Sequence, residues 1–151
     1  MRIPPVAVVL MAACSQRLLP ASKNKISYSN RFAAVAVAGV SIGLIGAAVR
    51  SFLVAGTTLD PVCPERSDSL VNSGVLRLTR NPMYLGLAGL LTAHAFCRQS
   101  LLAVIPVGWF LAIMDRYQIP TEERALKNTF GQEYVDYTLR VPRWIGFPRQ
   151  G

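Results

Sequence analysis

A long apolar stretch, Phe32 to Ala55, constrains the fold more than any other feature of the chain. Arg50 is its only charged residue. About 20 residues of helix are enough to cross the hydrocarbon core of a bilayer, and a segment in lipid must pair its own backbone polar groups. The stretch therefore predicts a membrane-spanning helix. Gly39, Gly43 and Gly46 recur within it and predict a smooth strip against which another helix packs.

A second apolar block, Met83 to Met114, is interrupted by the polar residues Arg98, Gln99 and Ser100. The interruption divides the block into two pieces of about 15 residues, each about 22 Å long as a helix. We interpret residues 82–114 as a hairpin of two short helices. Helices this short must pack partly inside protein, so we expect the hairpin to shelter a site near one membrane face.

The first apolar segment, Pro4 to Leu19, is broken by Ser15, Gln16 and Arg17. It is compatible with a spanning helix, a half-inserted helix or a cleaved signal sequence. We favour a first spanning helix in residues 1–19, because another membrane segment follows it rather than a soluble domain.

The composition agrees with a membrane protein of one domain, residues 1–151. Hydrophobic residues make up 52% of the chain, and 16 Lys and Arg against 8 Asp and Glu give a formal charge of +8. The cations form no long basic run, so we expect membrane lipids rather than nucleic acid as partners. The three cysteines form no CxxC pair, so we expect neither a disulfide framework nor a metal site. We expect the single histidine, His94, to be a hydrogen-bonded structural residue rather than a proton carrier.

The tail, residues 120–145, differs from the apolar segments because it mixes charged and apolar residues. Its apolar residues recur at spacings of four, four and three: Leu126, Phe130, Tyr134 and Tyr137. This period predicts an amphipathic helix that lies along the membrane surface or caps the bundle. Together the segments predict an all-α integral membrane bundle of about four transmembrane helices, with residues 31–55 as the second, followed by a C-terminal amphipathic helix.

Four spans place both termini on the same side of the membrane as the loop from Gly56 to Arg80. Arginines in that loop and in the tail make this side cytoplasmic by the positive-inside rule. Lys23, Lys25 and Arg31 lie in the opposite loop, so either the first segment does not fully span the membrane or the rule is weak here. We favour the cytoplasmic assignment for the side that carries the loop and the tail.

The sequence SGVLRLTRNPMYLG connects this loop to the second apolar block. Asn81 is placed to cap a helix, and Pro82 suits the first helical position. The free N–H groups of that helix, with Arg77 and Arg80 just before them, suit a carboxylate or phosphate, and the ring of Tyr84 suits a cation. The alternative is that these side chains only anchor the chain at the membrane interface. The residues by themselves favour neither interpretation.

Two adjacent carboxylates, Glu122 and Glu123, follow Pro120 at what reads as another helix start. Acidic residues in a first turn complement the helix dipole, which accounts for them without a ligand. They also suit the ammonium group or ribose hydroxyls of a ligand and would pair with Arg80 or Arg77 across a site. Other polar residues bordering the apolar segments are candidates for the same site: Thr57, Thr58, Asp60, Asp115 and Arg116.

Three blocks occur in a fixed order along the chain: SGVLRLTRNPMYLG, IPTEERAL and FGQEYVDYTLRVPRW. With AGTTLDP, at Ala55 to Pro61, they resemble the isoprenylcysteine carboxyl methyltransferase and phospholipid methyltransferase superfamily. The resemblance runs from about Arg31 to Trp144. It implies a helical membrane core that holds S-adenosylmethionine at the cytosolic face, while a lipophilic substrate enters from the bilayer.

Carried over residue by residue, the resemblance implies these cofactor contacts: Gly74, Arg77, Arg80, Asn81, Pro82, Tyr84, Gly86, Glu122 and Glu123. Gly74 would shape the approach, and the two glutamates would close the site. Arg80 and Glu123 are the candidate catalytic residues. The position before Pro82 is often His in this family and is Asn81 here, which puts in doubt any mechanism that uses that His as a base.

The predicted function is S-adenosylmethionine-dependent methyl transfer to a lipophilic acceptor. A prenylated cysteine carboxylate, a phospholipid amine and a small amphipathic metabolite all fit that description. The rival enzyme class is the NADPH-dependent membrane sterol or steroid reductases, which have a similar C-terminal pattern. The non-catalytic rival is a membrane scaffold in which the Arg and Tyr residues are only anchors. We expect the protein in a bacterial inner membrane, or in the endoplasmic reticulum of a eukaryote, with its active site facing the cytoplasm.

Overall fold

The computed structural model describes residues 4–55 and 70–145, and within these ranges it contains helices and no strands. The predicted all-α class is therefore confirmed. The helical elements are α1 (Pro5–Leu18), α2 (Tyr28–Val54), the 3-10 turn η2 (Gly74–Arg77), α3 (Pro82–Arg98), the 3-10 turn η3 (Leu101–Val104), α4 (Ile105–Ile113), the π-helical turn η4 (Met114–Gln118), α5 (Ile119–Phe130) and α6 (Gln132–Arg140).

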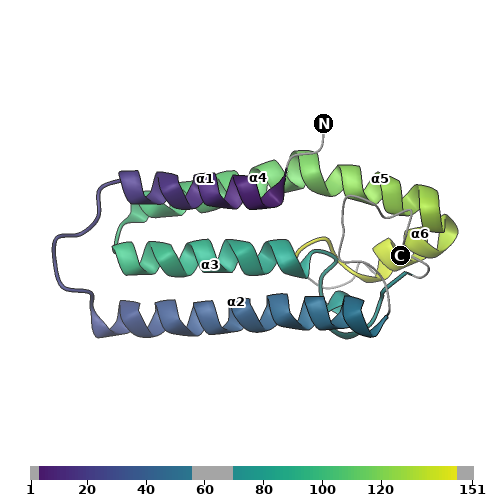
Figure 1. Ribbon diagram of the computed structural model, residues 1–151, viewed down its shortest axis with the longest axis horizontal. Coiled ribbons are helices and arrows are strands. Elements are labelled where there is room, and N and C mark those ends of the chain that lie inside the picture. The colour runs from purple at the N-terminus through teal and green to yellow at the C-terminus, as the bar shows by residue number, and fades with distance from the viewer. Residues whose placement is uncertain (1–3, 56–69, 146–151) are drawn as a thin grey trace.

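The long helices run side by side in three layers, with α3 between α2 and the pair formed by α1 and α4 (Figure 1). One end of the bundle, which we call the tail end, carries α5 and α6 together with the start of α3 and the end of α2. The other, which we call the far end, carries the turn from α1 to α2 and the turn from α3 to η3. The start of α1 and the residues that follow α6 also lie at the tail end, in agreement with the predicted four-helix arrangement.

Two helical runs, α2 and the continuous run Leu101–Phe130, are long and apolar enough to cross a membrane, judged by length and composition. Only 17% of the most apolar 18-residue stretch of α2 is buried in the bundle. Side chains such as Val35 and Val40 are exposed. A helix that exposes so much apolar surface suits lipid contact. The fold is consistent with a helical membrane bundle. The 14-residue α1 and the 17-residue α3 are shorter, and the number of spans stays a prediction.

The prediction that the glycine strip of α2 packs against another helix is wrong for the described residues. A Cβ atom placed on Gly39, Gly43 or Gly46 meets nothing within 4 Å. The close glycines of the α2–α3 contact belong to α3 instead: a Cβ on Gly86 would lie 2.9 Å from the carbonyl oxygen of Ser41. Both helices carry glycines, and spacing alone does not tell which set faces the partner helix.

The second arm of the predicted hairpin does not end at residue 114 but continues through η4 into α5. Pro120 is therefore not at a helix start, which corrects the sequence interpretation. A proline inside a helix lacks an N–H donor and crowds the carbonyl four residues earlier. The wider π-helical turn directly before it relieves that crowding without ending the helix.

The predicted tail helix is two helices, because Gly131, with φ of +54°, breaks it between α5 and α6. A glycine adopts this backbone conformation without steric cost. The predicted amphipathic pattern is confirmed, since Leu126 and Phe130 of α5 pack against the buried Tyr134 and Tyr137 of α6. The break folds the apolar faces of both helices onto one small core.

A buried amide holds three helical segments together inside the bundle. Gln16 of α1 is fully buried, and its Nε2 donates to the carbonyl oxygens of Leu91 at 2.9 Å and Ala103 at 2.7 Å. Its Oε1 lies 2.7 Å from Nδ1 of His94. His94 is thus hydrogen-bonded within the bundle, as expected.

Candidate active site

The loop before α3 is held in place by the small core of the tail. The hydroxyl of Tyr137 donates to the carbonyl oxygen of Leu76 at 2.7 Å, and burial raises the pKa of this hydroxyl, so that it stays a donor. Gly74, with φ of +59°, passes so close to α2 that a Cβ atom would lie 2.8 Å from Oγ of Ser51. Its role in the structure is to allow this close approach of the loop.

The segment after α6 runs alongside the same loop and fixes its last residues. The N–H of Arg80 donates to the carbonyl oxygen of Pro142 at 3.0 Å. The carbonyl oxygen of Arg143 accepts from Oγ1 of Thr79 at 3.1 Å and from Nδ2 of Asn81 at 3.0 Å. These bonds place the Arg80 side chain opposite α5.

Asn81 occupies the N-cap position of α3, and the next residue, Pro82, takes the first helical position as predicted. The side chain of Asn81 does not cap the helix, however, and this corrects the sequence interpretation. Its amide instead faces Arg143. The reason is tertiary, because a carbonyl oxygen from a distant segment lies within reach and accepts the amide proton.

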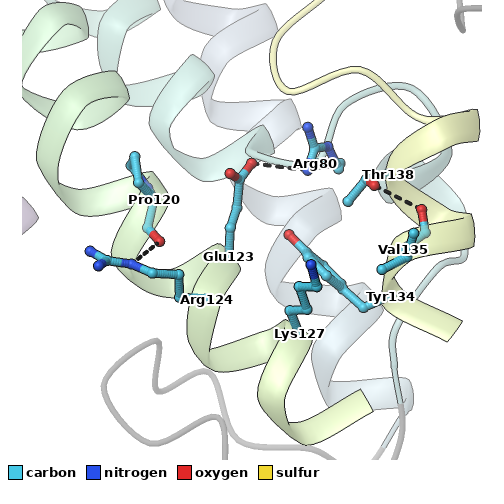
Figure 2. Close-up of a pocket in the computed structure, with 8 residues that line it drawn as sticks. All are labelled: Arg80, Pro120, Glu123, Arg124, Lys127, Tyr134, Val135 and Thr138. Carbon is cyan, nitrogen blue, oxygen red and sulfur yellow. Dashed lines mark hydrogen bonds and ion pairs between the residues drawn. The ribbon is translucent and has the colours of Figure 1, made fainter. Parts of the chain in front are cut away.

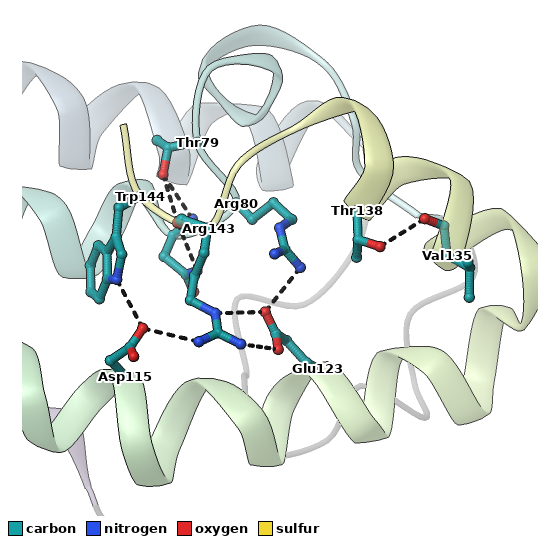
Figure 3. Close-up of polar contacts among 9 residues, drawn as sticks. Thr79, Arg80, Asp115, Glu123, Val135, Thr138, Arg143 and Trp144 are labelled. Carbon is teal, nitrogen blue, oxygen red and sulfur yellow. Dashed lines mark hydrogen bonds and ion pairs between the residues drawn. The ribbon is translucent and has the colours of Figure 1, made fainter. Parts of the chain in front are cut away.

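Glu123 of α5 binds two guanidinium groups (Figure 3). Its Oε1 lies 2.9 Å from Nη1 of Arg80 and 3.0 Å from Nε of Arg143, and its Oε2 lies 2.7 Å from Nη2 of Arg143. The hydrogen bond to Glu123 raises the pKa of the Arg143 guanidinium above its ordinary value. Paired contacts of this kind fix orientation as well as charge.

A second carboxylate extends this network. Asp115 in η4 accepts from Nη1 of Arg143 at 3.1 Å and from Nε1 of Trp144 at 2.9 Å. These hydrogen bonds hold the residues that follow α6 against η4 and α5. Arg143 lies at the centre, between Asp115 on one side and Glu123 on the other.

The two adjacent glutamates of α5 serve different partners. Glu122 accepts from the hydroxyl of Tyr84 at 2.5 Å and from Nε2 of Gln118 at 2.7 Å, whereas Glu123 faces the arginines. Neighbouring residues point in directions about 100° apart around a helix, so they cannot share one face. The prediction paired these glutamates with Arg80 or Arg77, and it is confirmed for Arg80 with Glu123.

A pocket of about 420 Å³ opens beside this network at the tail end (Figure 2). Its lining comes from α5, α6 and the loop before α3: Arg80, Pro120, Glu123, Arg124, Lys127, Tyr134, Val135 and Thr138. Nε of Arg80 is buried and has no hydrogen-bond partner among the described residues. Because this nitrogen has almost no accessible surface, the pocket does not expose it to a ligand.

The structure brings only some of the predicted site residues together. Arg80 and Glu123 line the pocket. Tyr84 and Glu122 are bonded to each other in the neighbouring α3–α5 contact, and Gly86 faces α2. Arg77 is exposed in η2, and Pro82 is buried at the start of α3. The candidates Thr57, Thr58 and Asp60 lie outside the described residues.

Sequence reasoning did not single out Arg143, Lys127 or Tyr134 as site residues. Arg143 was visible only as part of the block FGQEYVDYTLRVPRW, and nothing in its spacing ties it to Glu123. Tyr134 was noted for its helical period and was assigned to an amphipathic face. The break at Gly131 is what turns Tyr134 back toward α5 and the pocket.

Comparison with known proteins agrees with the resemblance seen in the sequence. A model of the phospholipid methyltransferase family matches residues 29–133. In an alignment of 117 positions that covers 72% of this chain and 58% of that protein, the chain is 33% identical to protein-S-isoprenylcysteine O-methyltransferase B of Arabidopsis thaliana. It is 36% identical over 63 residues to an uncharacterized protein of Haemophilus influenzae, which covers 42% of this chain and 100% of that protein.

No solved structure matches the chain. The chain spans 58% of the length of the Arabidopsis relative. The family match includes the loop before α3 and both glutamates of α5, and ends before Arg143. It covers well over half of the chain, which therefore belongs to the phospholipid methyltransferase family.

Proposed function

We propose that the protein transfers a methyl group from S-adenosylmethionine to a lipophilic acceptor at the cytosolic face of a membrane. The observation that carries the proposal is the ion-pair network of Arg80, Glu123 and Arg143 beside a pocket, at one end of an apolar helical bundle. Family membership supports the reaction type. The acceptor is the carboxylate of a prenylated cysteine-like compound or a lipid amine.

The residues around the pocket fit the cofactor by their chemistry. S-adenosylmethionine carries a carboxylate, an ammonium group and ribose hydroxyls besides its sulfonium. The guanidinium of Arg80, which lines the pocket, suits a carboxylate oxygen, and the oxygens of Glu123 suit an ammonium or hydroxyl group. A volume of about 420 Å³ falls within the range of small-molecule sites.

The bound cofactor would supply an activated methyl group on its sulfonium. The contribution of the protein is then to orient the reactants and to exclude water. Arg80 is suited to that task because Glu123 and the loop bond to Pro142 hold its side chain in one direction. A carboxylate acceptor is already ionised at neutral pH and needs no base. An amine acceptor must release a proton, and Glu122 or Glu123 is the nearest group to receive it.

The cytosolic assignment rests on the distribution of positive charge. The elements of the tail end carry most of the described cations: Arg50, Arg77, Arg80, Arg116, Arg124, Lys127, Arg140 and Arg143. The far end carries fewer: Arg17, Lys23, Lys25, Arg31 and Arg98. The side of a membrane protein with more Lys and Arg faces the cytoplasm. In a bacterium this membrane is the inner membrane.

The test is calorimetric titration of detergent-purified protein with S-adenosylmethionine and, separately, with NADPH. We expect saturable binding of S-adenosylmethionine that is lost in Glu123→Gln and retained in Arg140→Gln, an exposed arginine of α6 outside the pocket. Circular dichroism checks that each variant keeps its helices. Binding of NADPH alone would move the assignment to the reductases, and binding of neither ligand would favour a membrane scaffold.

A further inference from the structure

Among the described residues, the far end of the bundle carries five cations and no acid: Arg17, Lys23, Lys25, Arg31 and Arg98. The sequence has no Asp or Glu before Asp60 and none between Arg80 and Asp115. These stretches supply the described segments that meet at the far end (Figure 1). At the tail end, by contrast, five acids accompany the cations: Asp115, Glu122, Glu123, Glu133 and Asp136. The charge of the far end therefore stays unbalanced within the described structure.

The turn from α1 to α2, residues 19–27, is held in shape by one side chain of the neighbouring turn. Gln99 follows α3 with its backbone in the left-handed region, at φ of +49°. Its Nε2 donates to the carbonyl oxygens of Asn24 at 3.4 Å and Lys25 at 3.2 Å. Its Oε1 accepts from the N–H of Ser27 at 3.4 Å. This backbone conformation is costly for a residue with a side chain, and the bonds to the turn offset the cost.

Three of the far-end cations lie on this turn or directly after it. The side chains of Lys23, Lys25 and Arg31 are exposed, and none makes a hydrogen bond or ion pair with the described residues. Arg98 differs, because its Nη2 donates to the carbonyl oxygens of Arg17 and Leu19 at the end of α1. Lys23, Lys25 and Arg31 therefore direct their charges away from the bundle, toward whatever lies beyond it.

Large apolar side chains are exposed beside these cations. Ile26 is exposed in the turn, Tyr28 is 91% exposed at the start of α2, and Phe32 is 77% exposed one turn later. Phe32 also begins the apolar stretch of α2, so the turn lies at the level where this helix would leave the hydrocarbon core. Cations mixed with aromatic side chains at that level are typical of contact with lipid headgroups. A water-soluble acidic partner would account for the charges but not for the exposed apolar side chains.

From these observations we propose that the turn from α1 to α2 is a docking surface for anionic phospholipids. Lys23, Lys25 and Arg31 bind the phosphates, because each side chain offers donors and a positive charge. Tyr28 and Phe32 contact the acyl chains just below. This surface lies at the opposite end of the bundle from the pocket, so its lipids are distinct from a methyl acceptor bound there.

The experiment measures lipid preference by native mass spectrometry of the purified protein in an uncharged detergent. Phosphatidylglycerol and phosphatidylcholine with the same acyl chains are supplied in equal amounts, and the readout is the ratio of the two lipids retained. The test variant replaces Lys23, Lys25 and Arg31 with Gln. The matched control removes the same charge from exposed positions of the tail end, by Arg50→Gln, Arg116→Gln and Arg140→Gln together. Circular dichroism checks that both variants keep their helices.

We expect the wild type to retain mainly phosphatidylglycerol and the far-end variant to lower the ratio by about tenfold, since each cation near a lipid surface adds to the attraction. The control should stay within about twofold of the wild type, because acids accompany the cations at the tail end. Equal retention of the two lipids by the wild type, or equal falls in the two variants, would overturn the proposal.

A further variant, Gln99→Gly, tests whether the shape of the turn matters. Glycine accepts the left-handed backbone and leaves all the cations in place, but the turn loses the bonds from the Gln99 side chain. We expect the lipid ratio to fall by about threefold. An unchanged ratio in the folded variant would mean that positive charge alone attracts the lipid, and a docking surface built by this turn would be ruled out.

Discussion

Arg143 holds both carboxylate oxygens of Glu123, through Nε at 3.0 Å and Nη2 at 2.7 Å. The contact joins the last described turn of the chain to the middle of α5. Arg80 reaches the same carboxylate from the loop before α3. Three segments far apart in sequence therefore meet at one side chain, and the pocket lies beside their meeting point.

Replacing Arg143 tests whether this contact orients the site. We expect Arg143→Ala to lower the free energy of unfolding by about 1 to 2 kcal/mol, because it leaves two partly buried carboxylates with fewer partners. Arg143→Lys keeps the charge but loses the paired geometry, and we expect it to recover only part of the loss. Chemical denaturation in detergent gives the stabilities.

Calorimetry with S-adenosylmethionine separates positioning from stability in these variants. If Arg143 positions Glu123 and Arg80, the affinity falls in Arg143→Lys even at temperatures where the variant is fully folded. An unchanged affinity in a folded Arg143→Ala would restrict this residue to a structural role.

The helices were predictable because lipid-facing and core-facing segments leave strong signals in the sequence. The apolar stretch of α2, the polar interruption at Arg98 and Gln99, and the start of α3 at Pro82 all lie close to their predicted positions. Each signal is local, since it depends on hydropathy or on a residue with restricted backbone geometry. Predictions of this kind do not require knowledge of which segments meet.

What failed depended on contacts between segments. The side chain of Asn81 does not cap α3 but donates to the carbonyl oxygen of Arg143. Pro120 lies inside a continuous helix because a π-helical turn precedes it. The pairing of Arg80 with Glu123 was expected from charge, but the second guanidinium was not. A residue 20 positions beyond Glu123 meets it only because the chain turns at Gly131.

Gly86 offers a matched pair of substitutions with Gly43. A Cβ on Gly86 would lie 2.5 Å from Cγ1 of Ile45 and 2.9 Å from the carbonyl oxygen of Ser41, and the latter is backbone that cannot rotate away. We expect Gly86→Ala to destabilise the protein by about 1 to 3 kcal/mol, because α2 and α3 must move apart. Gly43→Ala meets nothing within 4 Å and should be neutral or slightly stabilising, since alanine favours helix. Thermal unfolding in detergent compares them.

Replacing Tyr84 tests its bond with Glu122 in two ways. A membrane scaffold and an enzyme would both lose stability, but only an enzyme would also lose affinity for its cofactor. Tyr84→Phe removes the donor at 2.5 Å and leaves the glutamate with Gln118. We expect a loss of about 1 to 3 kcal/mol, because Glu122 loses one hydrogen-bond donor and keeps the other. If Glu122 contacts the cofactor, affinity for S-adenosylmethionine falls as well. Normal affinity in folded Tyr84→Phe would argue that this pair only joins α3 to α5.

Gln16 allows the bundle to be weakened far from the pocket. Gln16→Leu keeps a similar volume but removes the donor to Leu91 and Ala103 and the partner of His94. The loss should be about 1 to 3 kcal/mol, because the ring nitrogen of His94 loses its partner inside the bundle. Affinity for S-adenosylmethionine should stay within about twofold of the wild type, since no contact of Gln16 reaches the lining of the pocket. A parallel fall in affinity would mean that the pocket depends on the packing of α1 against α3 and η3, and the site would then extend further into the bundle than its lining residues.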